Sequence, residues 1–172
     1  MKMLLAFLAL SSTSALVLPQ RPVLTHYASQ QVVHAATAEA KAANLAVTIC
    51  CVDAGGVPLA LARLDGAMPA SADLAVGKAR TAALFKRPTV GLEDGANGAR
   101  AALLSAGHVL MGGGVPIVVD GYCAGAVGVS GATPAEDARV AAAGVAAVCE
   151  TVAPRDGALE DAAITLEVEE AL

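Results

Sequence analysis

The sequence has very few aromatic residues. Its 172 residues include no tryptophan, two phenylalanines and two tyrosines, although 56% of the chain is hydrophobic. The core must therefore be built from Ala, Val and Leu, whose small side chains suit close contacts between helices and a sheet. Without a leader, about 150 residues remain, a length that fits one compact domain with its own core.

Positive charge is also scarce. Eleven Lys and Arg residues against sixteen Asp and Glu residues give a formal net charge of −5. Because nucleic acids are bound through clusters of Lys and Arg that neutralise phosphates, a nucleic acid is excluded as a partner. The apolar run at residues 3–10 is too short to span a bilayer, so we expect no membrane anchor in the mature chain.

The N-terminus is typical of a secretory leader. Lys2 precedes the apolar run, and the small residues Thr13 and Ala15 follow where a signal peptidase cuts. We predict a targeting peptide over residues 1–15, cleaved near Ala15, and a mature protein that is secreted. In a photosynthetic eukaryote with a complex plastid, the same leader suits the first half of a plastid-targeting signal. The alternative is a buried first helix.

Metal and redox motifs are missing. The four cysteines form no CxxC pair, and no Cys/His spacing typical of zinc is present. Cys50 and Cys51 are neighbours in a predicted strand and point to opposite faces, which disfavours a bond between them. We interpret all four cysteines, including Cys123 and Cys149, as small core residues.

The glycine-rich segment 112–137 matches no phosphate or nucleophile motif. Gly125, Gly128 and Gly131 are three residues apart, unlike the GxGxxG spacing of dinucleotide-binding folds, and no GxxxxGK[ST] loop is present. Ser130 misses the GxSxG pattern by one position. We interpret these glycines as positions that allow a helix or a ligand to approach a strand closely.

Two hairpins and four helices are predicted. Strands over 47–52 and 57–63 flank the turn at 53–56, and strands over 115–120 and 123–130 are joined by Asp120-Gly121. Helices are expected over 25–43, 71–85, 93–105 and 134–152, and the last one starts with a capping box of Thr133 and Glu136. Because such short turns join only antiparallel strands, we expect an α+β sandwich.

The three histidines are candidate ligands, because imidazole is a common ligand of haem iron. His26 lies at the start of the first predicted helix, where we expect exposure to solvent. His34 falls on the polar face of that helix, and is either a surface residue or a ligand at an oligomer interface. His108 and Met111 precede three glycines, so His108 either packs in a loop or lines a site for a flat ligand.

Lys78, Arg80 and the glycines after Met111 are further candidates. Lys78 and Arg80 are expected mainly on a solvated helix face. The alternative is that one of them binds a ligand carboxylate, for which the planar Arg fork is well suited. The amide groups of the glycine run, including Gly113 and Gly114, are predicted to hold a carboxylate or propionate.

Several motifs in one order resemble the GlcG/HbpS-like haem-binding (haem-degrading) family, which includes the C-terminal domain of PduO-type proteins. The resemblance covers residues 24 to 148. Its motifs are Leu64-Asp-Gly-Ala67, Ser71, Asp73, Lys78-Ala-Arg-Thr-Ala82, Arg87-Pro-Thr89, GGVPIVVDG and GAVGVSGATPAED.

The resemblance implies a profilin-like α-β-α sandwich around a five-stranded antiparallel sheet. It also implies homo-oligomers, often of eight subunits, and haem or iron binding in some members. We therefore predict a family domain over residues 24–153, followed by an acidic tail over 154–172, that binds haem or a related tetrapyrrole.

The resemblance implies a haem site with two walls, one from the first helix and one from the loop before the glycine run. Where members use a histidine of the first helix, His34 or His26 is the counterpart, and His108 with Met111 stands on the other wall. Two alternatives remain at this stage. One is an enzyme or accessory protein for a small 2-hydroxy or 2-oxo acid, anchored by Lys78 or Arg80, and the other is a non-catalytic oligomeric scaffold.

Overall fold

The structure is a computed structural model that describes residues 20–149. The predicted leader at 1–15, the predicted tail at 154–172 and the end of the last predicted helix beyond Cys149 lie outside these residues. The elements in chain order are α1 (His26–Ala42), β1 (Thr48–Asp53), β2 (Pro58–Arg63), α2 (Ser71–Phe85), α3 (Val90–Asn97), the 3-10 helix η1 (Ala101–Ala106), β3 (Gly114–Val119), β4 (Tyr122–Ser130) and α4 (Pro134–Cys149).

The sheet consists of the two predicted hairpins, paired through β1 and β4. Its strand order is β2-β1-β4-β3, and all neighbouring strands are antiparallel. The β3–β4 turn uses Asp120 and Gly121 at φ values of 49° and 75°, as the sequence predicted. The prediction of five strands is wrong for the described residues, because each hairpin contributes two strands and the other regular elements are helical.

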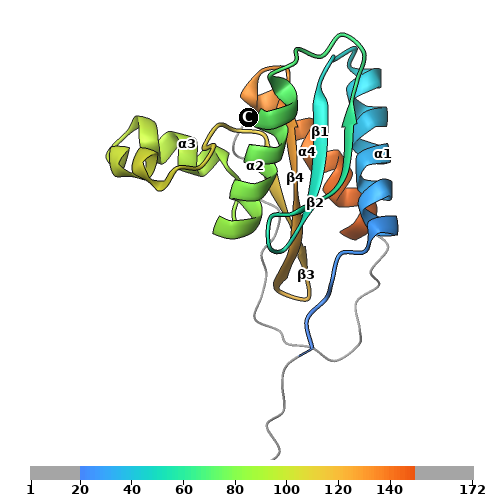
Figure 1. The fold of residues 1–172 in the computed structure, drawn as a ribbon, viewed down its shortest axis with the longest axis horizontal. Helices are drawn as coiled ribbons and strands as arrows, with labels where there is room; N and C mark the ends of the chain where they lie inside the picture. Colours follow the sequence, from blue (N-terminus) through green and yellow to red (C-terminus); the bar gives the residue numbers. More distant parts are fainter. Residues whose placement is uncertain (1–19, 150–172) are drawn as a thin grey trace, which may run out of the picture.

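Helices cover both faces of the sheet (Figure 1). α1 and α4 pack on one face and on each other, whereas α2 packs on the opposite face. Neighbouring residues of β1 belong to the two cores: Ile49 and Cys51 pack in the core beneath α1 and α4, and Cys50 and Val52 in the core beneath α2. The prediction that Cys50 and Cys51 are core residues on opposite faces is confirmed. Burial raises the pKa of Cys50 to about 11 and that of Cys51 to about 12.

Small residues bring α2 close to the sheet. A methyl group added at Gly128 of β4 would collide with the backbone of Ala75 and Ala79 in α2. The interpretation of this glycine as a position for close helix approach is therefore confirmed.

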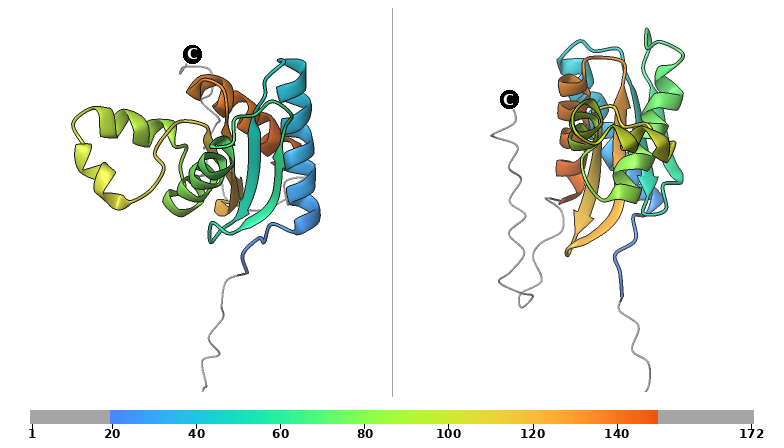
Figure 2. Two further views of the ribbon diagram at one scale, coloured as in Figure 1. Left: turned by 45° about the horizontal axis from the view of Figure 1, so that its top comes forward. Right: turned by 90° about the vertical axis from the view of Figure 1, so that its left-hand side faces the viewer.

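α3 and η1 form an arm, residues 90–106, that projects from the body of the molecule (Figures 1 and 2). The prediction of one helix over 93–105 is wrong. The α-helix starts earlier, at Val90, and ends at Asn97, because Gly98 adopts φ −108° and ψ −129°, outside the helical region. Tighter 3-10 turns follow, and they pack against α3.

The capping box at the start of α4 is confirmed. The Thr133 amide donates to Glu136 Oε2 at 3.1 Å, and the Glu136 amide donates to Thr133 Oγ1 at 3.3 Å. Hydrogen bonds from Thr133 lower the pKa of Glu136. Among the helices of residues 20–149, none is long and apolar enough to cross a membrane.

Candidate functional site

A groove with a volume of about 340 Å³ lies between α2 and the arm. Its walls are mainly apolar, with one imidazole, one carboxylate and one amide among them. The lining residues are Leu74, Glu93, Ala96, Asn97, Leu104, His108, Val109, Leu110 and Met111. Two residues predicted as ligand contacts, His108 and Met111, are thus brought together in one groove.

His108 is half-buried in the loop of residues 107–113, which we call the His108 loop. The loop starts at Gly107 in the left-handed region, with φ 69°, and returns the chain from the arm to the body. The His108 ring contacts Phe85 edge to face, with ring centroids 5.2 Å apart and an angle of 87° between the planes. Within residues 20–149, no group hydrogen-bonds the ring nitrogens, so they are available to a ligand.

The glycines that follow Met111 lie behind the groove. The Gly112 amide donates to Glu93 Oε2 at 2.8 Å, and the Gly114 amide donates to Thr89 Oγ1 at 2.9 Å. Gly113 and Gly114 are buried and do not line the groove. The amides predicted to hold a ligand carboxylate are therefore partly occupied by a carboxylate and a hydroxyl group of the protein itself.

Lys78 is buried, contrary to the prediction of a solvated helix face. Its side chain is 2% exposed, and Nζ donates to Asp137 Oδ2 at 2.7 Å. Asp137 Oδ1 also accepts a hydrogen bond from the Ala132 amide at 3.1 Å. Burial raises the pKa of Asp137, although Lys78 and the Ala132 amide oppose this effect. The Lys78 ammonium group is thus paired with Asp137 rather than open to a ligand carboxylate.

The buried pair lies directly beneath the His108 loop. A methyl group added at Gly113 would stand 3.1 Å from Lys78 Nζ and 2.7 Å from Asp137 Cβ. Gly113 also has φ 113°, which favours glycine. The pair therefore joins α2, the His108 loop and the start of α4.

Arg80 is exposed, as the sequence predicted, but it lies away from the groove. Its side chain covers the β1–β2 turn, where a methyl group added at Gly56 would stand 2.7 Å from Arg80 Cγ. Arg80 is not among the residues that line the groove. The structure thus does not bring Lys78 or Arg80 to the same surface as His108.

His26 and His34 are exposed on α1, and this helix lies on the face of the sheet opposite α2 and the groove (Figure 2). His26 Nδ1 is 3.2 Å from the Leu59 carbonyl oxygen. Because α1 and the groove flank opposite faces of the sheet, one subunit does not bring His34 and His108 together. In the described part of the chain, no three His, Cys, Asp or Glu side chains gather as a metal-binding group.

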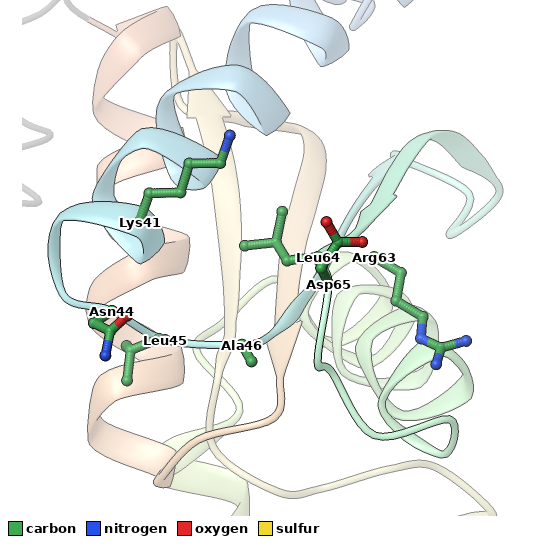
Figure 3. A pocket seen from close by; sticks show the side chains of 7 residues that line it. All are labelled: Lys41, Asn44, Leu45, Ala46, Arg63, Leu64 and Asp65. Atoms are coloured by element: carbon green, nitrogen blue, oxygen red, sulfur yellow. The ribbon is translucent and has the colours of Figure 1, made fainter.

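A second pocket, of about 360 Å³, lies where the α1–β1 connection meets the end of β2 (Figure 3). Lys41 and Arg63 line it, but the Arg63 guanidinium points away from Lys41. Arg63 donates two hydrogen bonds to the Ala67 carbonyl, at 3.0 and 3.3 Å. Because the cationic groups diverge, this pocket offers no focused anion site.

Sequence reasoning missed Phe85, Leu74 and Glu93. Phe85 and Leu74 come from α2, which is separated from His108 by the whole arm. Their spacing of eleven residues, three helical turns, was the available signal that they share a face. Glu93 was visible only as an acidic residue near a predicted helix start.

The sequence matches known proteins over most of its described part. The model of the family "Haem degrading protein HbpS-like" matches residues 24–146. Protein GlcG of Escherichia coli is 43% identical over 109 residues, which are 63% of this chain and 81% of GlcG. An uncharacterised 15.0 kDa protein of Citrobacter freundii is 34% identical over 127 residues, 71% of this chain and 89% of that protein.

Solved structures agree with the sequence matches. Klebsiella pneumoniae protein ORFY has a TM-score of 0.73 and 29% identity, covering 81% of this chain and all of ORFY. A double mutant of Streptomyces reticuli HbpS has a TM-score of 0.69 and 33% identity, covering 75% and 89%. A PduOC:haem complex has a TM-score of 0.68 and 30% identity, covering 73% and 95%. With the antiparallel sheet between two helical layers, these matches place the chain in the HbpS-like family.

Proposed function

We propose that this protein binds haem or a related tetrapyrrole in the groove between α2 and the arm, with His108 as an iron ligand. The observation that carries the proposal is the half-buried His108 imidazole, whose nitrogens have no partner among residues 20–149, on a groove with apolar walls. The solved complex of the similar PduOC with haem supports this ligand class.

The residues present fit such a group. When bound, haem would supply a flat apolar ring and an iron that binds an imidazole, which His108 would provide. Leu74, Leu104 and Leu110 provide apolar contact for a ring, and Met111, 44% exposed, offers a polarisable thioether beside it. At 340 Å³ the groove is near the lower end of the usual ~300–1,000 Å³ for ligand sites, so it suits one edge of a macrocycle.

A homo-oligomer is part of the proposal. His34, the other proposed iron ligand, is on the far side of the sheet from the groove, so it reaches the same ligand only from a second subunit. Exposed apolar side chains on the arm also favour association, since Leu104 is 69% exposed and Val90 45%.

Haemin titration of the purified protein tests the proposal. We expect saturable binding and a shifted Soret band. His108→Ala should weaken binding by at least about tenfold. Loss of a residue that only hydrogen-bonds a metal ligand already costs about that much, and His108 is proposed to bind the iron directly. His34→Ala should also weaken it if a second subunit completes the site.

His26→Ala is the matched control, because His26 is exposed on the same helix as His34 but is held near the Leu59 carbonyl. It should bind haemin like the natural protein. Absence of saturable binding, or equal binding by His108→Ala, would contradict the assignment. The alternative of an organic-acid ligand required Lys78 or Arg80 to bind the ligand carboxylate. Lys78 does not serve this role, because its ammonium group is paired with Asp137.

A further inference from the structure

One face of α2 supports the His108 loop. Leu74, Lys78 and Phe85 recur on that face at helical spacing. Leu74 lines the groove, the Lys78 ammonium lies beneath Gly113, and Phe85 contacts the His108 ring. The loop is therefore held by α2, in addition to the hydrogen bond from the Gly112 amide to Glu93 of the arm.

Gly77 allows the Val109 side chain of the loop to pack directly on α2. A methyl group added at Gly77 would stand 2.5 Å from Cγ2 of Val109, the residue next to His108. A larger residue at this position must push Val109 outward, and His108 with it.

Phe85 sets the orientation of the imidazole. Without hydrogen bonds from residues 20–149, the His108 ring is held by packing, and its edge-to-face contact with Phe85 is the one ring–ring contact found in that part of the chain. Phe85 itself is fixed, because it is the last residue of α2 and Lys86 ends the helix in the left-handed region, with φ 54°.

We propose that Phe85 is a positioning residue that holds the His108 ring for ligand binding, and that Gly77 sets the position of the neighbouring Val109. The inference rests on the proposed function, because it takes haem as the ligand. The first of the two experiments below nevertheless uses the protein without a ligand.

The first experiment measures modification of each histidine by diethyl pyrocarbonate, followed by mass spectrometry. Phe85→Leu should speed modification of His108 by about 2- to 10-fold, the range that an edge-to-face ring pair contributes. His26 lies on α1, on the far side of the sheet, and serves as the internal control, so its rate should not change. Phe85→Tyr keeps the ring and should restore the natural rate at His108.

The second experiment measures haemin affinity in a double-mutant cycle. Phe85→Leu should raise the Kd by about 2- to 10-fold in the natural background. It should have no further effect in a His108→Ala background, because Phe85 acts through His108. Equal effects in both backgrounds would overturn the inference, since Phe85 would then contact the ligand or support the fold in general.

Gly77→Ala provides an independent variant on the same helix. We expect faster modification of His108 and weaker haemin binding, as with Phe85→Leu. Gly91→Ala is its control, because a methyl group there meets no atom within 4 Å. It should leave both readouts unchanged.

The two hypotheses fail separately. If the natural protein does not bind haemin, the proposed function fails, and the modification rates still test the positioning of His108. If haemin binds but Phe85→Leu and Gly77→Ala, both folded by their thermal midpoints, leave the His108 rate and the Kd unchanged, the inference is overturned.

Discussion

At the scale of single residues, Lys78 and Asp137 form a buried ion pair with a large expected effect on stability. Both side chains are 2% exposed, and their contact of 2.7 Å links two helices that are far apart in sequence. Removal of one partner leaves the other buried and unpaired, which costs about 3–5 kcal/mol, whereas apolar replacement of both is often neutral.

We predict that Lys78→Met lowers the free energy of unfolding by about 3–5 kcal/mol at pH 8, measured by urea denaturation. The loss should shrink at lower pH. Burial already raises the pKa of Asp137 in the folded protein, and the substitution removes the opposing ammonium. The folded variant therefore binds more protons than the unfolded chain between the two pKa values of Asp137, so its stability falls as pH rises through that window.

The double variant Lys78→Met/Asp137→Leu is the control for this prediction. It removes both charges and should recover most of the stability, with little of the pH dependence of the single variant. A single variant as stable as the natural protein at pH 8 would show that the pair does not contribute as its burial indicates.

The burial of Lys78 was outside the reach of sequence reasoning. Its local pattern, with Asp73 and Arg80 nearby, is that of a solvated face, and its partner comes from α4. The environment of His108 was partly predictable, because the glycines after Met111 indicate a loop. Its contact with Phe85 depends on tertiary packing, which no local pattern encodes.

At the scale of elements, small residues decide how the layers fit. β4 contributes Ala126 and Gly128 to the face beneath α2, so the helix backbone approaches the sheet closely. A chain with almost no aromatic residues can fill its core in this way, because the layers need little volume between them.

We predict that Gly128→Ala destabilises the protein by about 3 kcal/mol, the upper end of the range for overpacking. The added methyl would meet the backbone of Ala75 and Ala79, which cannot rotate away as a side chain can. Urea denaturation measures the change. By contrast, Gly91→Ala in the exposed helix α3 should be neutral or stabilise the protein by up to about 1 kcal/mol. Similar effects of the two substitutions would refute this account of the packing.

The sequence predicted the hairpins, α1, α2 and the start of α4, because their turn residues, periodicity and capping box are local signals. The boundaries of the arm were not predictable to the same degree. Gly95 and Gly98 weaken any helical pattern, and the position of the break depends on how η1 packs against α3. The five-stranded sheet came from the family resemblance and not from this chain's own pattern, which contains two hairpins.

At the scale of the whole molecule, the projecting arm exposes apolar surface that no other part of the described subunit covers. It projects from the body and carries Leu104 with 69% of its surface exposed, next to the groove that contains His108. An apolar side chain that is this exposed on a projecting arm gains little from its own subunit, whereas association of two subunits removes it from water.

We predict that the purified protein is a homo-oligomer by light scattering, and that Leu104→Glu shifts it toward smaller species. A buried, unpaired carboxylate at an interface costs several kcal/mol, enough to change an association constant by more than about a hundredfold. Val57→Glu is the matched control, because Val57 is 59% exposed on the β1–β2 turn, outside the arm, and should leave the mass unchanged. A natural protein that is monomeric at all concentrations would contradict the oligomer, and His34 and His108 would then be unable to share one ligand.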